Sequence, residues 1–141
     1  MIEHILYLDG MKMLSECYRV LKTSGKIRIS TPNLAFLFNL YRPDKSELER
    51  EYIQWSCKTF VDWAPEGNAT FVINNFVRDW GHAFIYDENT LRQAMEKAGF
   101  SHITAHELQK SDDEVLCNLE NETRMPPGFV RLETFTLEGT K

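Results

Sequence analysis

The histidines are the side chains whose type and spacing first suggest chemistry. His102 and His106 lie four residues apart, a spacing that brings two imidazoles to one metal ion when the segment is helical. The surrounding "SHITAHELQ" alternates instead, which predicts a strand with the two rings about 13 Å apart on one face. Cys17, Cys57 and Cys117 also lack the spacing of metal ligands. We therefore expect no metal site.

A second group, Trp80, His82 and Tyr86, combines aromatic rings with one imidazole. Such a cluster could shape a substrate pocket. It could instead be a patch of core aromatics with one hydrogen-bonded histidine, which is the simpler interpretation. The segment "SDDE" could attract a cation, but acids are also typical of a solvated helix start.

The composition limits the classes of function. The chain has 141 residues, a formal net charge of -5 and no apolar run near the roughly 18 residues of a membrane span. The acidic balance argues against nucleic acid and anionic membranes as partners, because both attract clustered Lys and Arg. Three scattered cysteines favour reduced thiols and a cytoplasmic location. The length suits one domain.

Alternating helices and strands must position these side chains. We expect a helix from about Gly10 to Lys22, with Asp9 as its cap and a left-handed Gly25 as its stop. A strand over Lys26–Ser30 follows, with Ile27 and Ile29 on one face, and ends because Pro32 has no N–H for the ladder.

The next part of the chain is a helical insertion over about 33–80. Beyond it the pattern returns to a helix and two strands. The expected elements, in chain order, are helices beginning at Asn33 and Ser46, a loop over 64–69, a helix over Thr70–Trp80, a helix from Asp87 to Gly99, a strand over 101–109, a short helix from Ser111 and a last strand over Phe129–Leu137.

In this order the segments resemble a known family. The run "EH…ML.E..RVLK..GKI.IS.P" is similar to the second half of a class I S-adenosylmethionine-dependent methyltransferase domain of the methyltransferase type 11-like kind. "WGHAFIYDENTLRQAMEKAGF" resembles the family's approach to its sixth strand, and "FVRLETFTLEGTK" its seventh strand. The stop Thr23-Ser24-Gly25 departs from the family pattern, which has a proline and a further glycine there.

The resemblance implies an α/β, partial Rossmann-like fold. Its three-stranded mixed sheet would have the order fifth, seventh, sixth strand, in a single truncated methyltransferase-like domain over 1–141. The N-terminal cofactor-binding half would be absent, and none of the seven glycines forms the family's G-x-G loop. We therefore expect S-adenosylmethionine to be the cofactor of the complete family, and this chain alone to bind none, since no cofactor-binding residue is convincing.

The resemblance also suggests site residues. His4 lies where a loop of the family approaches cofactor and substrate, and the carboxyl end of the fifth strand is the edge where open α/β sheets bind ligands. His4 could also be a surface residue, and the two residues after that strand a turn and a helix cap. The candidates are His4 and His82 as catalytic bases, and Pro32, Asn33, Trp80 and Tyr86 for substrate binding.

Two functions remain open at this point. The chain could be the substrate-side half of a methyltransferase-like protein, inactive alone because the glycine-rich loop is missing. It could instead be a non-catalytic oligomerisation or regulatory module. In either case the fifth strand would leave one sheet edge unpaired, so we expect a homodimer or a partner chain at that edge.

Overall fold

The computed structural model describes residues 1–65 and 67–141 and has three strands at its centre. The first part of the chain contains the 3-10 turn η1 (Ile2–His4), α1 (Tyr7–Val20), β1 (Lys26–Pro32), α2 (Leu34–Tyr41), α3 (Glu47–Phe60) and α4 (Ala69–Arg78). The second part contains α5 (Glu88–Ala98), β2 (Ser101–His106), the turns η2 (Glu114–Leu116) and η3 (Glu122–Arg124), α6 (Phe129–Glu133) and β3 (Thr134–Thr140). Residue 66 of the expected 64–69 loop lies outside the described residues.

The sheet has the order β1-β3-β2, so the last strand of the chain is the central one. β3 pairs antiparallel with β1 from Lys26↔Thr140 to Pro32↔Thr134, and antiparallel with β2. The expected mixed sheet is therefore wrong in one respect. β1 and β2 run in the same direction, but β3 separates them, so no parallel ladder forms between described residues.

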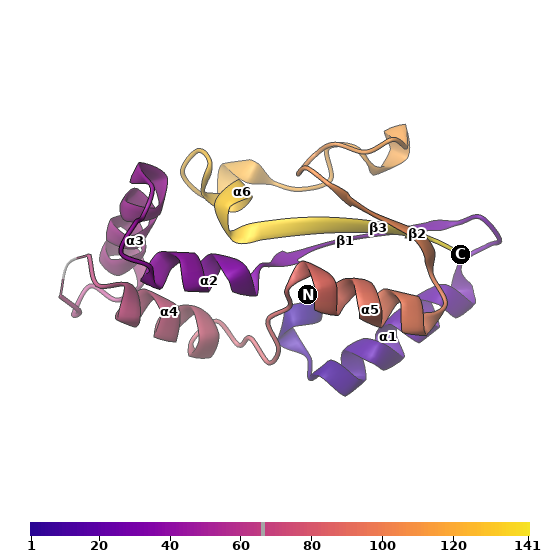
Figure 1. Cartoon of the computed structure of the whole chain (residues 1–141), viewed down its shortest axis with the longest axis horizontal. Helices are drawn as coiled ribbons and strands as arrows, with labels where there is room; N and C mark the ends of the chain where they lie inside the picture. Colours follow the sequence, from indigo (N-terminus) through magenta and orange to yellow (C-terminus); the bar gives the residue numbers. More distant parts are fainter. Residues whose placement is uncertain (66) are drawn as a thin grey trace.

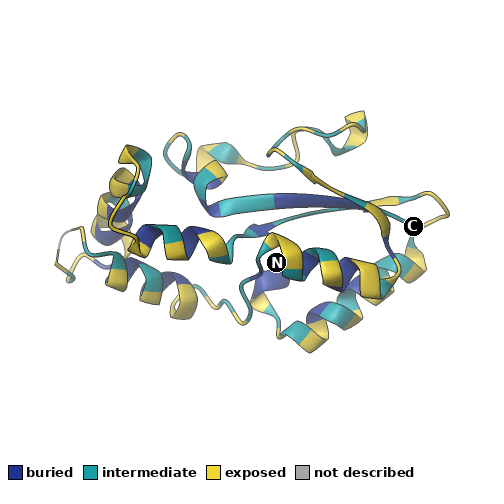
Figure 2. Ribbon diagram, viewed as in Figure 1, coloured by how far each residue is buried: buried dark blue, intermediate teal, exposed yellow. Residues whose placement is uncertain are grey.

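Helices cover one face of this sheet. α1 and α5 lie together under the strands, whereas α2, α3 and α4 form a helical lobe beyond one end of them (Figure 1). The sheet core under the strands contains Leu14, Leu91, Met95 and Leu137, each 0% exposed. The buried side of β3 and the exposed outer faces of both helices are visible in Figure 2. Burial of these apolar side chains is what holds α1 and α5 to the sheet.

A separate core fills the helical lobe. Its buried members include Phe36, Leu40, Tyr52 and Phe76, which come from α2, α3 and α4. The rings of Phe36 and Tyr52 meet edge to face at 4.9 Å. Phe129 of α6 packs against this lobe as well, and so connects it to the strand that follows.

Side-chain caps begin α2, α3, α4 and α5, and all of these except the Asn68 cap of α4 are at positions that the sequence predicts. Asn33, Asn68 and Asp87 each accept a backbone N–H two or three residues later. Ser46 and Glu49 form the expected capping box.

The start of α1 differs from the prediction. The helix begins at Tyr7, so Asp9 lies inside its first turn and pairs with Lys12 instead of capping. Gly10 is helical and buried because Tyr86 lies against it, and a Cβ there would be 2.7 Å from the Tyr86 hydroxyl oxygen.

The end of α1 also differs from the prediction. The chain leaves the helix at Leu21 in an extended conformation. The residue that then takes the left-handed conformation is Ser24, with φ 62°, and Gly25 does not.

Two elements near the C-terminus are corrected as well. The expected strand over Phe129–Leu137 is instead the helix α6 followed by β3. Phe129 and Val130 are both buried in α6, and strand pairing begins only at Thr134. The expected helix from Ser111 is only the 3-10 turn η2, since the Ser111 hydroxyl bonds to Glu138 and to the Asp113 N–H.

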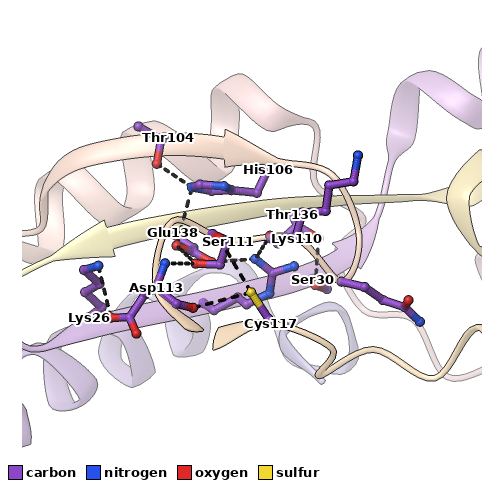
Figure 3. Close-up of polar contacts among 12 residues, drawn as sticks. Lys26, Ser30, Thr104, His106, Lys110, Ser111, Asp113, Cys117, Thr136 and Glu138 are labelled. Carbon is purple, nitrogen blue, oxygen red and sulfur yellow. Dashed lines mark hydrogen bonds and ion pairs between the residues drawn. The ribbon is translucent and has the colours of Figure 1, made fainter. Parts of the chain in front are cut away.

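The other face of the sheet carries a polar cluster built around Arg28, which we call the Arg28 cluster. Arg28 Nε donates to Glu120 Oε1 at 2.7 Å and Nη1 to Glu138, with only 3% of the Arg28 side chain exposed. Ser111 and His106 reach the same Glu138 carboxylate from the neighbouring loop and strand (Figure 3). These bonds hold the segment after β2 across the sheet.

Candidate functional site

A cavity of about 400 Å³ opens at the carboxyl end of β1. Its walls come from η1, the end of β1, the segment after α4, the loop around η3 and the start of β3. Of the residues predicted from the sequence, His4, Pro32, Trp80 and His82 line this cavity. The structure therefore brings together side chains that lie up to 78 positions apart, because β1 and the η1 turn end beside the last turn of α4.

Backbone hydrogen bonds hold η1 in place. The carbonyl oxygen of Glu3 accepts from Ala83 N at 2.7 Å and from Phe84 N at 3.1 Å. These bonds fix the turn carrying Glu3 and His4 against the segment carrying His82. Both sequence-distant pieces are therefore positioned by backbone contacts, which do not depend on the side chains that enter the cavity.

The Glu3 carboxylate is one buried acid of the cavity wall. Its side chain is only 10% exposed, and Oε2 accepts a hydrogen bond from Thr31 Oγ1 at 3.1 Å. Burial alone would raise the pKa of Glu3, but hydrogen bonds from the N-terminal amino group, its own backbone and Thr31 outweigh that cost and lower it. Glu3 is therefore an anion near neutral pH.

The two imidazoles lie side by side, with ring centroids 5.1 Å apart. His4 Nδ1 is 3.1 Å from the Gly81 carbonyl oxygen, and His82 Nδ1 is 2.6 Å from that of Phe76. Carbonyl oxygens only accept, so each Nδ1 carries a proton and each Nε2 of a neutral ring keeps its lone pair. Burial, opposed by the bond to Phe76, lowers the pKa of His82, which keeps this ring neutral at pH 7.

One ligand atom from each of Glu3, His4 and His82 lies within 4.8 Å of the other two. We call these three residues the Glu3–His4–His82 cluster. Sequence reasoning did not join them, because it weighed only His102 and His106 as a metal pair. Those two are strand residues of β2, where His106 contacts Thr104 and Glu138. The resemblance marked His4, and the aromatic group marked His82, but neither signal pointed to a metal site.

A second buried acid, Glu133, also lines the cavity. It is 3% exposed, accepts from Tyr52 Oη at 2.8 Å and pairs with Arg124 Nη2 at 2.9 Å. Burial raises the pKa of Glu133 despite these bonds, and burial together with the Glu133 charge raises that of Tyr52. With Glu3 and Glu120 also in the wall, carboxylates outnumber the single guanidinium of Arg124 in the lining.

The remaining predicted residues lie outside the cavity lining. Asn33 caps α2 by accepting from Ala35 N at 3.0 Å, and its own N–H bonds to the Glu133 carbonyl. Tyr86 is 0% exposed in the sheet core, and its hydroxyl has no hydrogen-bond partner among the described residues. Burial, with a smaller contribution from Tyr7, raises the pKa of Tyr86 to about 12.

In the part of the chain that the structure covers, no helix combines the length and apolar character needed to cross a bilayer.

Comparison with known proteins supports the fold and leaves the family open. No protein-family model matches the chain, and neither does any curated protein sequence. Among solved structures, the chain is similar to one described as a SAM dependent methyltransferase from Archaeoglobus fulgidus, with a TM-score of 0.50 and 16% sequence identity. The match covers 99% of this chain and 55% of that chain. This chain therefore spans about half the length of that protein and has a methyltransferase-like α/β fold.

Proposed function

We propose that this chain provides the acceptor side of an S-adenosylmethionine-dependent methyl transfer, and that the cavity beside β1 receives the methyl acceptor. The observation that carries the proposal is the collection of His4, His82, Trp80 and Pro32 around one cavity in a methyltransferase-like fold. The position also supports it, because open α/β sheets bind ligands beyond the carboxyl ends of their strands.

The chemistry required is modest and suits the side chains present. The cofactor, when bound, would supply the methyl group and keep the electrons of the broken carbon–sulfur bond, and the acceptor would have to lose a proton. Positioning contributes most of the acceleration in such a step, and a general base helps. His4 and His82 each use Nδ1 for a carbonyl, so Nε2 of either ring could take that proton, with His4 Nε2 3.4 Å from Glu3 Oε1, while Trp80 offers an aromatic wall to an acceptor.

We expect this chain alone to bind S-adenosylmethionine weakly. None of the seven glycines forms a G-x-G loop, the element that would bring the backbone close to the cofactor. Calorimetric titration with S-adenosylmethionine should therefore give a Kd above about 1 mM. A micromolar Kd would contradict this part of the proposal.

The acceptor part needs its own test. Ligand-observed NMR with a set of small aromatic alcohols and amines should find compounds that bind the cavity. Trp80→Ala should abolish their signal, whereas Trp63→Ala should not, because Trp63 is 72% exposed and packs on Phe71 in the helical lobe. Equal binding by both variants would place the ligands elsewhere and overturn the proposal.

An alternative function, a non-catalytic assembly module, is favoured by the outer edge of β1. Within the described residues β1 has a partner strand on one side only. Such an edge can recruit another strand, from a second copy or from a partner chain. Light scattering at about 100 µM should then give the mass of a dimer, and a mass equal to one chain would exclude the homodimer.

A further inference from the structure

The Glu3–His4–His82 cluster is arranged like a set of metal ligands. Each side chain has one polar atom held by the protein and one atom left over. The held atoms are Glu3 Oε2, bonded to Thr31, and the two Nδ1 atoms, bonded to the Gly81 and Phe76 carbonyls. Metal-binding histidines usually donate their second N–H to a carbonyl or carboxylate in this way, which fixes the tautomer and the ring orientation.

Ligand atoms of the three residues lie close together. Glu3 Oε1 is 3.4 Å from His4 Nε2, and one ligand atom of each residue lies within 4.8 Å of the others. Ligands about 2.0–2.1 Å from a tetrahedral ion stand roughly 3.3 Å apart. The Glu3–His4 pair already has that separation. The other separations are no more than 4.8 Å, so a modest side-chain adjustment would bring all three residues to one ion, and the His4 side chain is 46% exposed.

The surroundings favour a cation with an open coordination position. All three residues line the cavity of about 400 Å³, so its volume is available to a further ligand. Glu133 lies in the same wall, and its carboxylate adds negative charge when ionised. Two imidazoles and one carboxylate, with a remaining position for water or substrate, are a donor set typical of catalytic zinc. Mg²⁺ and Ca²⁺ prefer oxygen ligands alone.

We propose that Glu3, His4 and His82 form a binding site for a divalent transition-metal ion, with Zn²⁺ as the ion that fits the donor set. The expectation of a chain without a metal site considered spacing along the sequence, whereas this site comes from segments joined by the Glu3 backbone bonds to residues 83 and 84.

One consequence rests on the proposed function: a bound ion would take an acceptor hydroxyl as its fourth ligand and lower the pKa of that group. The acceptor would then be an alcohol or a phenol whose proton would pass to solvent water, because both imidazoles would be ligands of the ion and could not act as bases.

The test is a competition titration of the full chain, without a histidine tag, against a chromophoric zinc chelator. We expect one Zn²⁺ per chain with a Kd below about 1 µM. His82→Gln and Glu3→Gln should each weaken binding at least tenfold. His102→Gln is the matched control, because it removes an exposed imidazole outside the cluster, and it should bind as the unmodified chain does.

Two further measurements keep the outcome clear. Far-UV circular dichroism must show that each variant is folded, and Thr31→Val, which leaves all three ligands in place, should weaken Zn²⁺ by about tenfold. The absorption spectrum of the Co²⁺-loaded chain should lack thiolate charge-transfer bands, since Cys17, Cys57 and Cys117 are not in the cluster.

Three results would overturn the proposal. These are no Zn²⁺ bound at about 100 µM, equal affinity in His82→Gln and the unmodified chain, and strong thiolate bands with Co²⁺. None of these measurements uses S-adenosylmethionine or an acceptor. A failed methyl-transfer or acceptor-binding experiment therefore leaves the metal result standing, and a failed metal titration leaves the acceptor result standing.

Discussion

The Arg28 cluster and the Glu3–His4–His82 cluster both depend on β1, yet they use their polar atoms in opposite ways. In the Arg28 cluster the guanidinium bonds to two carboxylates and to the carbonyl oxygens of Lys110 and Glu107. In the Glu3–His4–His82 cluster Nδ1 of each imidazole bonds to a carbonyl oxygen, and Nε2 does not. The first arrangement is complete by itself, whereas the second leaves atoms for a ligand.

The alternation of β1 explains how one strand serves both. Arg28 and Ser30 point to the face where both reach Glu120, while Thr31 points to the opposite face and reaches Glu3. Buried charge alone therefore does not identify a functional site. The useful criterion is whether the buried polar groups are already satisfied.

Breaking the Arg28 cluster should produce the largest loss of stability. Arg28→Met leaves two nearly buried carboxylates without their cation, because Glu120 is 10% and Glu138 6% exposed at the side chain. We expect the free energy of unfolding to fall by about 3–5 kcal/mol in urea denaturation. The control is Arg42→Met, whose exposed pair with Asp44 should leave the unfolding midpoint unchanged. Similar midpoints for the two variants would contradict the comparison.

The Arg28 cluster should also make the free energy of unfolding depend on pH. Burial alone would raise the pKa of Glu120, but the bonds from Arg28, Ser30 and the Gln109 N–H outweigh it and lower the pKa to about 2. Because the folded-state pKa is depressed, the stability from Glu120 is present above about pH 4.5 and is lost as the pH falls toward 2.

This dependence can be measured against Glu120→Gln, which cannot titrate. Urea denaturation at several values between pH 6 and pH 2 should show the unmodified chain losing roughly 1–3 kcal/mol more than the variant. Parallel loss in both proteins would show that Glu120 is not paired in the folded state.

Replacing Thr31 should lower the free energy of unfolding by less than replacing Arg28, and should also weaken Zn²⁺ binding at the Glu3–His4–His82 cluster. Thr31→Val removes the hydroxyl that bonds to Glu3 Oε2 in a residue only 1% exposed, so we expect a loss of about 1 kcal/mol. Thr104→Val, at an exposed position of β2, should change the free energy of unfolding much less. A larger loss from Thr104→Val would reverse the expected order.

His4 should give the smallest effect on stability. His4→Gln alters a side chain that is 46% exposed and bonded to one carbonyl, so the unfolding midpoint should barely move. A loss of stability like that of Arg28→Met would mean that the Glu3–His4–His82 cluster holds the fold together, and would remove the distinction between the two clusters.

Local physical chemistry allowed much of the fold to be predicted. The caps at Asn33, Ser46 and Asp87 act through backbone N–H groups two or three residues away, so the sequence contains both partners. The left-handed Gly99 at the end of α5 belongs to the same class. Two predictions of this kind were wrong. Asp9 lies inside the first turn of α1 and does not cap it, and Phe129, which packs into the core of the helical lobe, begins the helix α6 and not a strand.

Only some residues of the cavity beside β1 were predicted from the sequence. His4 and Pro32 were marked through a resemblance, and Trp80 and His82 through their residue types, but no local signal connected the two pairs. Glu3, Glu120 and Glu133 were not proposed at all, since an acid in a sequence of this charge looks like one more surface residue. Their burial could only be recognised once the cavity walls were assembled.

The sequence by itself determined the helices, the alternation of β1 and the acidic balance, because each depends on residues that are neighbours along the chain. The tertiary structure alone decided which polar groups would be satisfied and which would stay free. That outcome depends on carbonyls and carboxylates brought from distant segments: the Gly81 carbonyl for His4, and Glu120 for Arg28. Whether a buried group can still bind something depends on partners that the order of residues does not reveal.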